Sequence, residues 1–275
     1  MSDRDTILDV NGLSVYIQTD YGLVHAVQEV SFQVRPGKVM GIVGESGCGK
    51  SMTCMAVLGL LPAAAAITQG SVRLRGKELT DLKESDFRRI RGKELSLVLQ
   101  NPMTAFNPVL TVGKQFAETL RTHQNLSRKQ ADQLAVDCLK QVGLLEAEKI
   151  LGQYPFELSG GMLQRIMVAL SVSMKPALLI ADEPTTALDS VNRRKVMEMF
   201  RRIKEEENTA ILLVSHDLSF IGELADEVMV MKQGRIVEKA AATELMTCPQ
   251  HEYTKLLLDA RLTADSRKRI GVETK

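Results

Sequence analysis

The residues best suited to chemistry lie in two glycine-containing segments. Residues 44–51 fit the pattern G-x-x-x-x-G-K-[ST], whose glycines let backbone N–H groups curl around nucleotide phosphates. In that pattern Lys50 can reach the β- and γ-phosphates, and the hydroxyl of Ser51 can bind Mg²⁺. Residues 158–165 place Ser-Gly-Gly where a helix should begin, which is another site suited to an anion. Together the two segments predict a protein that hydrolyses ATP and works in pairs.

The second segment has more glycine than a helix start requires. Ser159 has the features of an N-cap, because apolar residues at helical spacing follow it. Capping accounts for the serine, but not for Gly160 and Gly161. Glycine costs helix stability and is useful where a backbone must approach something closely. This surplus favours a phosphate contact at the start of the helix.

Two adjacent carboxylates follow residues 178–181, an apolar segment typical of a buried strand. Asp182 and Glu183 therefore emerge at the carboxyl end of a strand, where open α/β sheets bind their ligands. Asp182 suits direct or second-shell coordination of Mg²⁺, and Glu183 is placed to polarise the attacking water as general base. A solvated acidic turn before Pro184 is the alternative. The glycine loop in the same chain favours the catalytic interpretation.

Two further polar residues end apolar segments. His216 follows a buried strand ending at Ser215, so it can hydrogen-bond a γ-phosphate, although a lone histidine is more often structural. Gln100 ends the strand expected at residues 95–99, so its amide can reach the metal or the water. By itself that glutamine would mean little, and its weight comes from the other motifs.

The elements that must position these residues alternate between strands and helices. Residues 39–43 predict a short buried strand that leads directly into the glycine loop, and helical spacing follows until Pro62. This strand, loop and helix order is the context that a phosphate loop requires. The remaining pattern predicts strands within 7–34 and at 71–74, 95–99, 178–181 and 211–214, a loop at 63–66, a helix around 193–207 and a closing hairpin over 228–237. Such alternation predicts a mainly parallel sheet covered on both faces.

The domain boundaries follow from changes in composition. Residues 111–149 are polar and rich in Gln and Lys, which predicts a mostly helical insertion, taken as about 101–172. The main domain is expected to span 5–245, followed by a short tail at 246–275. The last stretch, 263–275, is charged and is expected to fray.

The overall composition excludes several classes of protein. With 275 residues, 44% hydrophobic and 25% charged, the chain is typical of a soluble globular domain. A net charge of +1 gives no case for bulk nucleic-acid attraction, so no nucleic-acid partner is expected. No apolar run approaches the roughly 20 residues that span a bilayer, and the polar, acidic start does not resemble a signal peptide. Four scattered cysteines favour the reduced thiols of a cytoplasmic protein, with any membrane role peripheral.

On these motifs the chain resembles an ABC-transporter ATPase, over about residues 7–240. Residues 44–51 resemble the Walker A loop, Gln100 the Q-loop residue, 158–165 the signature motif, 178–183 the Walker B strand with its catalytic glutamate, 187–189 the D-loop and His216 the switch histidine. The resemblance implies an α/β fold of the P-loop NTPase (RecA-like) type, with a mainly parallel sheet, an antiparallel β subdomain and a helical insertion subdomain.

The resemblance also assigns roles to individual residues, with ATP and Mg²⁺ as cofactors. It implies catalysis by Glu183, His216 and Gln100, and Mg²⁺ binding by Ser51, Gln100 and Asp182. Tyr21 falls where the family stacks an aromatic ring on adenine, with Tyr16 as a possible substitute. The implied nucleotide contacts are Tyr21, Gly44, Glu45, Ser46, Gly47, Cys48, Gly49, Lys50, Ser51, Met52, Ser159, Gly160, Gly161 and Asp189.

The family implies a head-to-tail dimer, in which Ser159 and Gly161 of one subunit close over ATP held by the other. The implied partners are two integral-membrane permease subunits, a second ATPase (itself or a related chain, with the related chain favoured) and, indirectly, an extracytoplasmic solute-binding protein. The groove near residues 100–108 is where the family receives a permease helix, with Met103, Ala105 and Phe106 as apolar contacts, or Phe106 as core. The implied location is the cytoplasmic face of the bacterial inner membrane.

Sequence features outside these motifs indicate which branch of the ABC-transporter ATPases the chain resembles. The segment 248–254 resembles the "H-P-Y-T" element of oligopeptide, dipeptide and nickel importer ATPases, with Glu252 in place of its proline. Residues 100–108 and 154–158 are also similar to that branch, and most similar to its nickel-import members. The cysteine-rich tail of many peptide-branch relatives is missing, so no iron–sulfur cluster is expected. The expected cargo is therefore nickel, a metal chelate or a small peptide.

Two other classes of protein compete with an importer ATPase. A soluble ABC-type protein acting on DNA or the ribosome usually carries long coiled coils or two ATPase units, and neither is present in this sequence. A regulatory subunit that holds ATP without turnover is disfavoured by the intact Glu183 and His216. A di- or oligopeptide importer ATPase is the alternative within transport.

Overall fold

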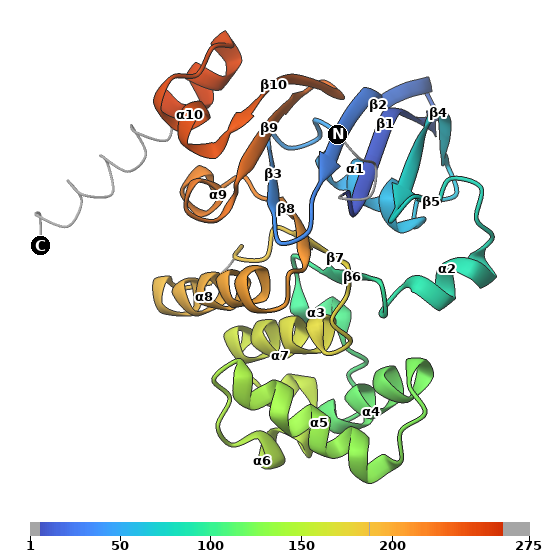
Figure 1. The fold of residues 1–275 in the computed structure, drawn as a ribbon, viewed down its shortest axis with the longest axis vertical. Helices are drawn as coiled ribbons and strands as arrows, with labels where there is room; N and C mark the ends of the chain where they lie inside the picture. The colour runs from blue at the N-terminus through green and yellow to red at the C-terminus, as the bar shows by residue number, and fades with distance from the viewer. Residues whose placement is uncertain (1–5, 187, 261–275) are drawn as a thin grey trace, which may run out of the picture.

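The computed structural model describes residues 6–186 and 188–260. Ala187, expected in the D-loop, and the segment 263–275, expected to fray, lie outside the described residues. Within the described ranges the chain forms two β-sheets and a group of helices at one end of the molecule (Figure 1). Over the same ranges no helix combines the length and apolar character needed to cross a bilayer.

The larger sheet has six strands in the order β10-β9-β3-β8-β7-β6. Strands β9, β3, β8, β7 and β6 pair in parallel, and β10 closes one edge as the antiparallel partner of β9. This confirms the mainly parallel sheet and the closing hairpin. The bounds are β3 Val39–Val43, β6 Leu95–Val98, β7 Leu178–Asp182, β8 Ala210–Val214, β9 Glu227–Lys232 and β10 Arg235–Ala241.

The second sheet is antiparallel, in the order β2-β1-β4-β5. Its bounds are β1 Leu8–Thr19, β2 Gly22–Val34, β4 Ala65–Leu74 and β5 Lys77–Glu78. The prediction of a loop at 63–66 is wrong, because β4 begins at Ala65. In the pairing of β4 with β1, Ala65 lies opposite Ile17 and Ala66 lies opposite Tyr16. Alanine has little strand preference of its own. The long edge of β1 offers backbone partners that override it.

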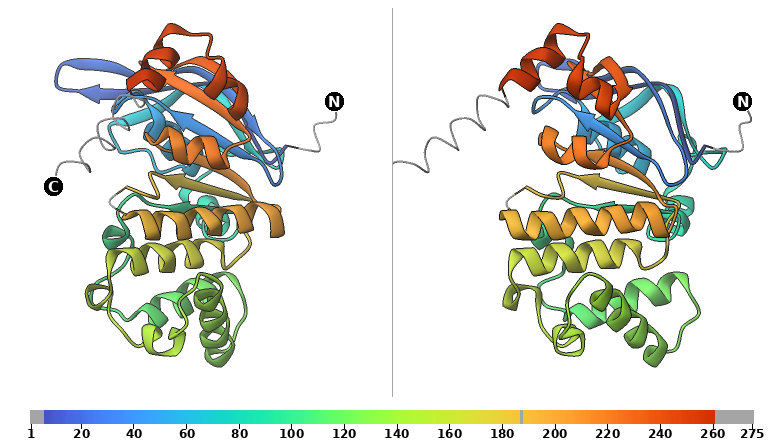
Figure 2. Two further views of the ribbon diagram at one scale, coloured as in Figure 1. Left: turned by 90° about the vertical axis from the view of Figure 1, so that its left-hand side faces the viewer. Right: turned by 60° about the vertical axis from the view of Figure 1, so that its left-hand side comes forward.

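Helices cover both faces of the larger sheet and form the insertion. α7 and α8 run side by side beneath the sheet, and α4, α5 and α6 lie beyond them at the end of the molecule (Figure 2). The bounds are α1 Lys50–Leu58, α2 Glu84–Ile90, α3 Pro102–Ala105, α4 Val112–His123, α5 Arg128–Gln141, α6 Ala147–Leu151, α7 Gly160–Val172, α8 Ser190–Glu206, α9 Leu218–Leu224 and α10 Ala242–Thr247. A 3₁₀ turn lies at Pro155–Glu157, and residues 252–260 are also helical.

The hydrophobic core is divided by the larger sheet into two clusters. Strand β3 illustrates the division: Val39 and Val43 belong to the cluster shared with the helical insertion, whereas Met40 and Ile42 belong to the cluster shared with the antiparallel sheet. All five residues of β3 are buried. A strand buried on both faces holds its carboxyl end firmly, and the glycine loop begins at that end.

Candidate functional site

The glycine loop connects β3 to α1 and is packed tightly against other backbone. Gly44 has φ +152°, and a Cβ built on it would lie 2.3 Å from the carbonyl oxygen of Met231 in β9. Gly49 has φ +109°, and its Cβ would lie 2.4 Å from the carbonyl oxygen of Ala26 in β2. Any side chain at either position would force the loop away from its neighbours. The first motif is therefore glycine-rich because of its surroundings as well as its shape.

The loop curls around its own lysine. Nζ of Lys50 donates hydrogen bonds to the carbonyl oxygens of Gly44 and Glu45, both at 2.8 Å. Sγ of Cys48 lies 3.8 Å from the same nitrogen. Lys50 is 8% exposed, so these oxygens stand in for water as the hydrogen-bond partners of its ammonium. No side chain caps the start of α1, and its first turn contains no acidic residue, so that its N–H groups suit an anion.

Asp182, the last residue of β7, lies beneath this loop. Burial raises the pKa of its carboxyl group, while a hydrogen bond from the Ser51 side chain and the charge of Lys50 oppose the rise. Its Oδ1 atom is buried and has no hydrogen-bond partner. A buried carboxylate oxygen without a partner beside a serine hydroxyl is a donor set that fits Mg²⁺, which is often held by one or two carboxylates together with substrate phosphates.

Glu183 and His216 are brought together from two neighbouring strands. Nδ1 of His216 lies 2.6 Å from Oε2 of Glu183, and the backbone N–H of His216 donates to Oε1 at 3.0 Å. Thr186 donates a third hydrogen bond, to Oε2 at 3.0 Å. Glu183 has φ +52°, a left-handed conformation that costs a non-glycine residue about 1–3 kcal/mol. The N–H of Glu183, which donates to the carbonyl of Val214, helps to hold this conformation.

Lys50, Ser51, Glu183 and His216 line a single cavity of about 450 Å³, whereas Asp182 and Thr186 are not part of its lining. The sequence predicted most of its lining, but it did not predict Ile17 or Ala26, which come from β1 and β2. Alternation along β1 places Ile17 on the same face as Val15. This alternation is the sequence pattern that could have indicated that Ile17 faces inward. The lining residues are Ile17, Ala26, Ser46, Gly47, Gly49, Lys50, Ser51, Met52, Gln100, Glu183 and His216.

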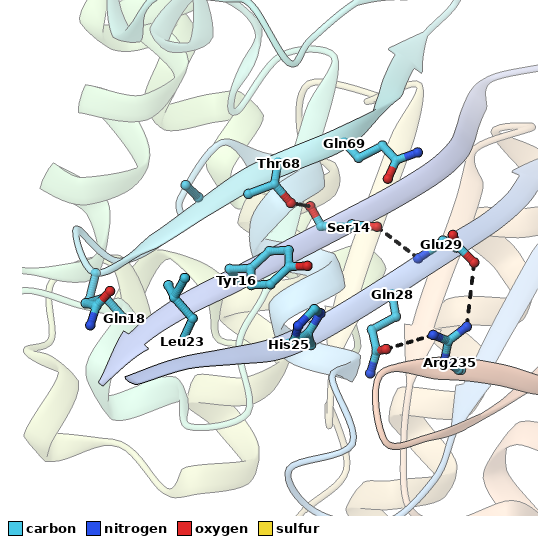
Figure 3. Close-up of a pocket in the computed structure, with 12 residues that line it drawn as sticks. Ser14, Tyr16, Gln18, Leu23, His25, Gln28, Glu29, Thr68, Gln69 and Arg235 are labelled. Atoms are coloured by element: carbon cyan, nitrogen blue, oxygen red, sulfur yellow. Dashed lines mark hydrogen bonds and ion pairs between the residues drawn. The ribbon is translucent and has the colours of Figure 1, made fainter. Parts of the chain in front are cut away.

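Neither tyrosine expected near adenine lies in this cavity. Tyr21 is fully exposed in the turn between β1 and β2. Tyr16 lines a separate groove of about 710 Å³ on another part of the antiparallel sheet, where its ring lies 4.0 Å from that of His25 (Figure 3). Ile17, the next residue of β1, is the one that reaches the glycine-loop cavity.

The groove around Tyr16 is lined by polar and apolar side chains from β1, β2 and β4 and by Arg235 at the start of β10. The Glu29 N–H donates to Oγ of Ser14 at 3.0 Å, and Arg235 donates to the Gln28 side chain at 2.9 Å (Figure 3). The latter bond ties the start of β10 to β2. The groove shares no lining residue with the glycine-loop cavity.

The second glycine segment lies outside the cavity. Oγ of Ser159 accepts a hydrogen bond from the N–H of Met162 at 3.3 Å and caps α7 as predicted. A Cβ on Gly160 would meet nothing within 4 Å, whereas a Cβ on Gly161 would lie 2.7 Å from the side chain of Asn192. A side chain at position 161 would therefore have to displace Asn192, whereas Gly160 opens to solvent.

Asp189 joins the same group of residues at the start of α8. Its Oδ1 accepts from the backbone N–H of Asn192 at 2.8 Å, and its Oδ2 accepts from the Asn192 side-chain amide at 2.7 Å. Asn192 thereby connects the cap of α8 to the start of α7. Neither Asp189 nor residues 159–161 line the glycine-loop cavity.

The fold and the site together define a P-loop nucleotide-binding protein. The sequence profile of the ABC transporter family matches residues 27–186. The chain belongs to the ABC transporter family, and within it the chain is an ATPase.

Curated relatives cover almost the whole chain. The oligopeptide transport ATP-binding protein AppD of Bacillus subtilis (strain 168) is 45% identical, over 92% of this chain and 77% of its own length. The dipeptide transport ATP-binding protein DppD of the same organism is 42% identical, over 92% and 76%. The glutathione import ATP-binding protein GsiA of Escherichia coli (strain K12) is 40% identical over 94% of this chain, which spans 42% of GsiA.

Solved structures confirm the expected fold class. A dimeric ATP-binding cassette in a post-hydrolysis state with ADP and inorganic phosphate has a TM-score of 0.77 at 24% identity, covering 86% of this chain and 98% of its own. CbiO1 from Clostridium perfringens, part of an ABC transporter complex, has a TM-score of 0.74 at 24% identity, covering 88% and 90%.

Replacing the charge of Asp182 should stabilise the nucleotide-free protein. Because the pKa of Asp182 is raised in the fold, its ionisation opposes folding as pH rises through that pKa. We expect Asp182→Asn to raise the melting temperature at pH 8 and the gain to shrink as the pH falls through the raised pKa, where the wild-type carboxyl becomes protonated. The exposed Asp81→Asn is the control and should show no such trend. A lower melting temperature for Asp182→Asn at pH 8 would contradict this account.

Glu183 is expected to act in hydrolysis rather than in binding. Glu183→Gln should reduce ATP turnover by about a hundredfold or more, the usual contribution of a general base, while the Kd for ATP stays within a few fold. Thr186→Val removes only one hydrogen bond to the carboxylate and should cost less than tenfold. A phosphate-release assay and a binding titration check both. Wild-type turnover no faster than that of Glu183→Gln would contradict the assignment.

Proposed function

We propose that this ATPase powers the uptake of a small peptide or peptide-like solute through the permeases of a bacterial ABC importer. The observation that carries the proposal is the 40–45% identity, over more than nine tenths of the chain, to ATP-binding proteins named for oligopeptide, dipeptide and glutathione transport. Nickel is the cargo that residues 100–108 and 154–158 favour, but these three relatives give it no support. It remains the second candidate because residues 100–108 and 154–158 resemble nickel-import members.

In the proposed reaction each group at the cavity has one task. The N–H groups of residues 46–51 and the ammonium of Lys50 hold the β- and γ-phosphates. Ser51 and Asp182 would hold Mg²⁺, with Gln100 reaching it from the edge of the cavity; the ion would neutralise charge on the phosphates. Glu183 orients the attacking water and accepts its proton. His216, whose Nδ1 lies 2.6 Å from Oε2 of Glu183, would hydrogen-bond the γ-phosphate.

The proposed site is completed by a second subunit. Ser159, Gly160 and Asp189 lie at exposed helix starts and do not line the cavity of their own chain. Gly160 leaves open space, so another chain's nucleotide can approach the N–H groups of α7. A head-to-tail pair would place this surface over the partner's cavity. The second ATPase is either an identical chain or a related one, and the branch resemblance favours the related chain.

The proposed permease contact lies on α3 and the loop after it. Met103 is 48% exposed and Val109 is 73% exposed, and Ala105 is also on the surface. Phe106, in contrast, is 5% exposed and belongs to the core, so it supports this surface from beneath. Since this segment follows directly after Gln100, a contact here can transmit changes at the nucleotide to the permease. This geometry supports a peripheral position at the cytoplasmic face of the inner membrane.

Purification of the tagged chain from detergent-solubilised membranes tests the importer proposal. We expect mass spectrometry to identify two integral permease subunits and a second ATPase, with a solute-binding protein encoded or captured alongside. A chain recovered only in the soluble fraction, alone or with ribosomes or DNA, would contradict transport. Uptake of labelled dipeptide, glutathione and nickel by cells with and without the chain then separates the cargoes.

ATP-driven pairing can be tested on the slow-turnover background. We expect Glu183→Gln to associate with its ATPase partner, or with itself, when ATP is added, as measured by light scattering. Adding Gly160→Arg should abolish that association without lowering the melting temperature of the monomer, because its side chain points into open space. Normal association of the double variant would contradict a partner at this surface.

A further inference from the structure

The chain returns to the glycine loop after its last strand. Following α10, the carboxylate of Glu238 accepts hydrogen bonds from the N–H groups of Gln250 at 2.8 Å and His251 at 3.0 Å. Nδ1 of His251 in turn accepts from the N–H of Tyr253 at 3.0 Å. These bonds fix the start of the helical segment 252–260 against β10, and they determine where Tyr253 points.

Tyr253 is buried against the loop. The residue is 5% exposed, and the ammonium of Lys232 lies 4.7 Å from the centre of its ring. Its hydroxyl oxygen accepts a hydrogen bond from the backbone N–H of Glu45 at 3.1 Å, across 208 positions of sequence. Burial raises the pKa of this hydroxyl, so it stays neutral over the physiological range.

Glu45 is the residue through which Tyr253 can act on nucleotide binding. While its N–H donates to Tyr253, its carbonyl oxygen accepts from Nζ of Lys50 at 2.8 Å and from the N–H of Cys48 at 3.3 Å. One end of the residue is therefore held by the C-terminal segment, and the other end holds the phosphate-binding lysine. The loop is also held from the turn between β9 and β10 by the N–H of Gly234, which donates to the carbonyl of Cys48 at 2.9 Å.

We propose that Tyr253 is a positioning residue for nucleotide binding: it touches no nucleotide, but its hydroxyl holds Glu45 so that the loop keeps its phosphate-binding shape before ATP arrives. A loop that occupies its binding shape only part of the time binds with an apparent Kd raised by the inverse of that fraction. Without the hydroxyl, the Glu45 N–H loses its partner and other loop shapes become more populated. The segment 248–254 is thereby part of the nucleotide site.

Tyr253→Phe tests the proposal, because it removes one oxygen atom and keeps the ring beneath Lys232. We expect the Kd for ADP and the KM for ATP to rise about five- to tenfold, while kcat at saturating ATP stays within twofold. Tyr154→Phe makes the same chemical change away from the loop and should leave both constants unchanged. Lys50→Ala is measured alongside, and its loss of nucleotide binding verifies that residues 44–51 are the site.

Hydrogen–deuterium exchange of the nucleotide-free proteins gives a second measurement that a loss of global stability would not reproduce. We expect Tyr253→Phe to speed exchange in residues 44–51 and to leave α5 in the helical insertion unchanged. An unchanged Kd in Tyr253→Phe would overturn the proposal. So would a fall in kcat with an unchanged KM, or exchange that accelerates equally throughout the protein. None of these outcomes depends on transport, so the importer proposal stands or fails separately.

Discussion

The close approach between the glycine loop and the backbone of β2 and β9 is the constraint on which the rest of the structure depends. Met231 and Ala26 present carbonyl oxygens where side chains at 44 and 49 would have to be. The loop can occupy this space only if the antiparallel sheet, which supplies β2, is seated against the larger sheet, which supplies β9. The cluster around Met40 and Ile42 holds the two sheets together. The glycine loop can therefore take its phosphate-binding shape only when the two sheets are packed against each other.

The site contains buried polar and charged groups whose unfavourable free energy the core must offset. Asp182 keeps a buried oxygen without a partner, and Lys50 is enclosed by two backbone carbonyls. Such groups are unfavourable unless something of opposite charge or complementary geometry is bound. The flanking strands β3, β7 and β8 are buried almost completely, and their apolar contacts supply the stability that these groups remove. The same strands therefore carry both the buried polar groups that await a charged ligand and the apolar packing that offsets their cost.

Local patterns predicted the elements around the chemistry well, for a physical reason. Strand β3 is short and wholly apolar, and β7 is apolar up to its last residue, Asp182, so few other conformations compete. The start of β4 was missed because Ala65 and Ala66 join a strand only through backbone pairing with β1. The contacts of Ile17 with the cavity, of Asn192 with Gly161 and of Tyr253 with Glu45 depend on how distant elements meet. No periodicity of three or four residues carries that information.

The left-handed backbone at Glu183 has a consequence for how this chain can vary. The residue that would fit φ +52° without cost is glycine, but glycine has no carboxylate to hold His216 in place. Glycine at position 183 would relieve a backbone cost of about 1–3 kcal/mol, but it would also lose the hydrogen bonds that the carboxylate accepts from His216 and Thr186. Glutamate at this position combines the backbone cost with the contacts that its carboxylate makes to His216 and Thr186. A library of variants selected only for folding would therefore tolerate glycine at position 183, whereas a library selected for ATP hydrolysis would not.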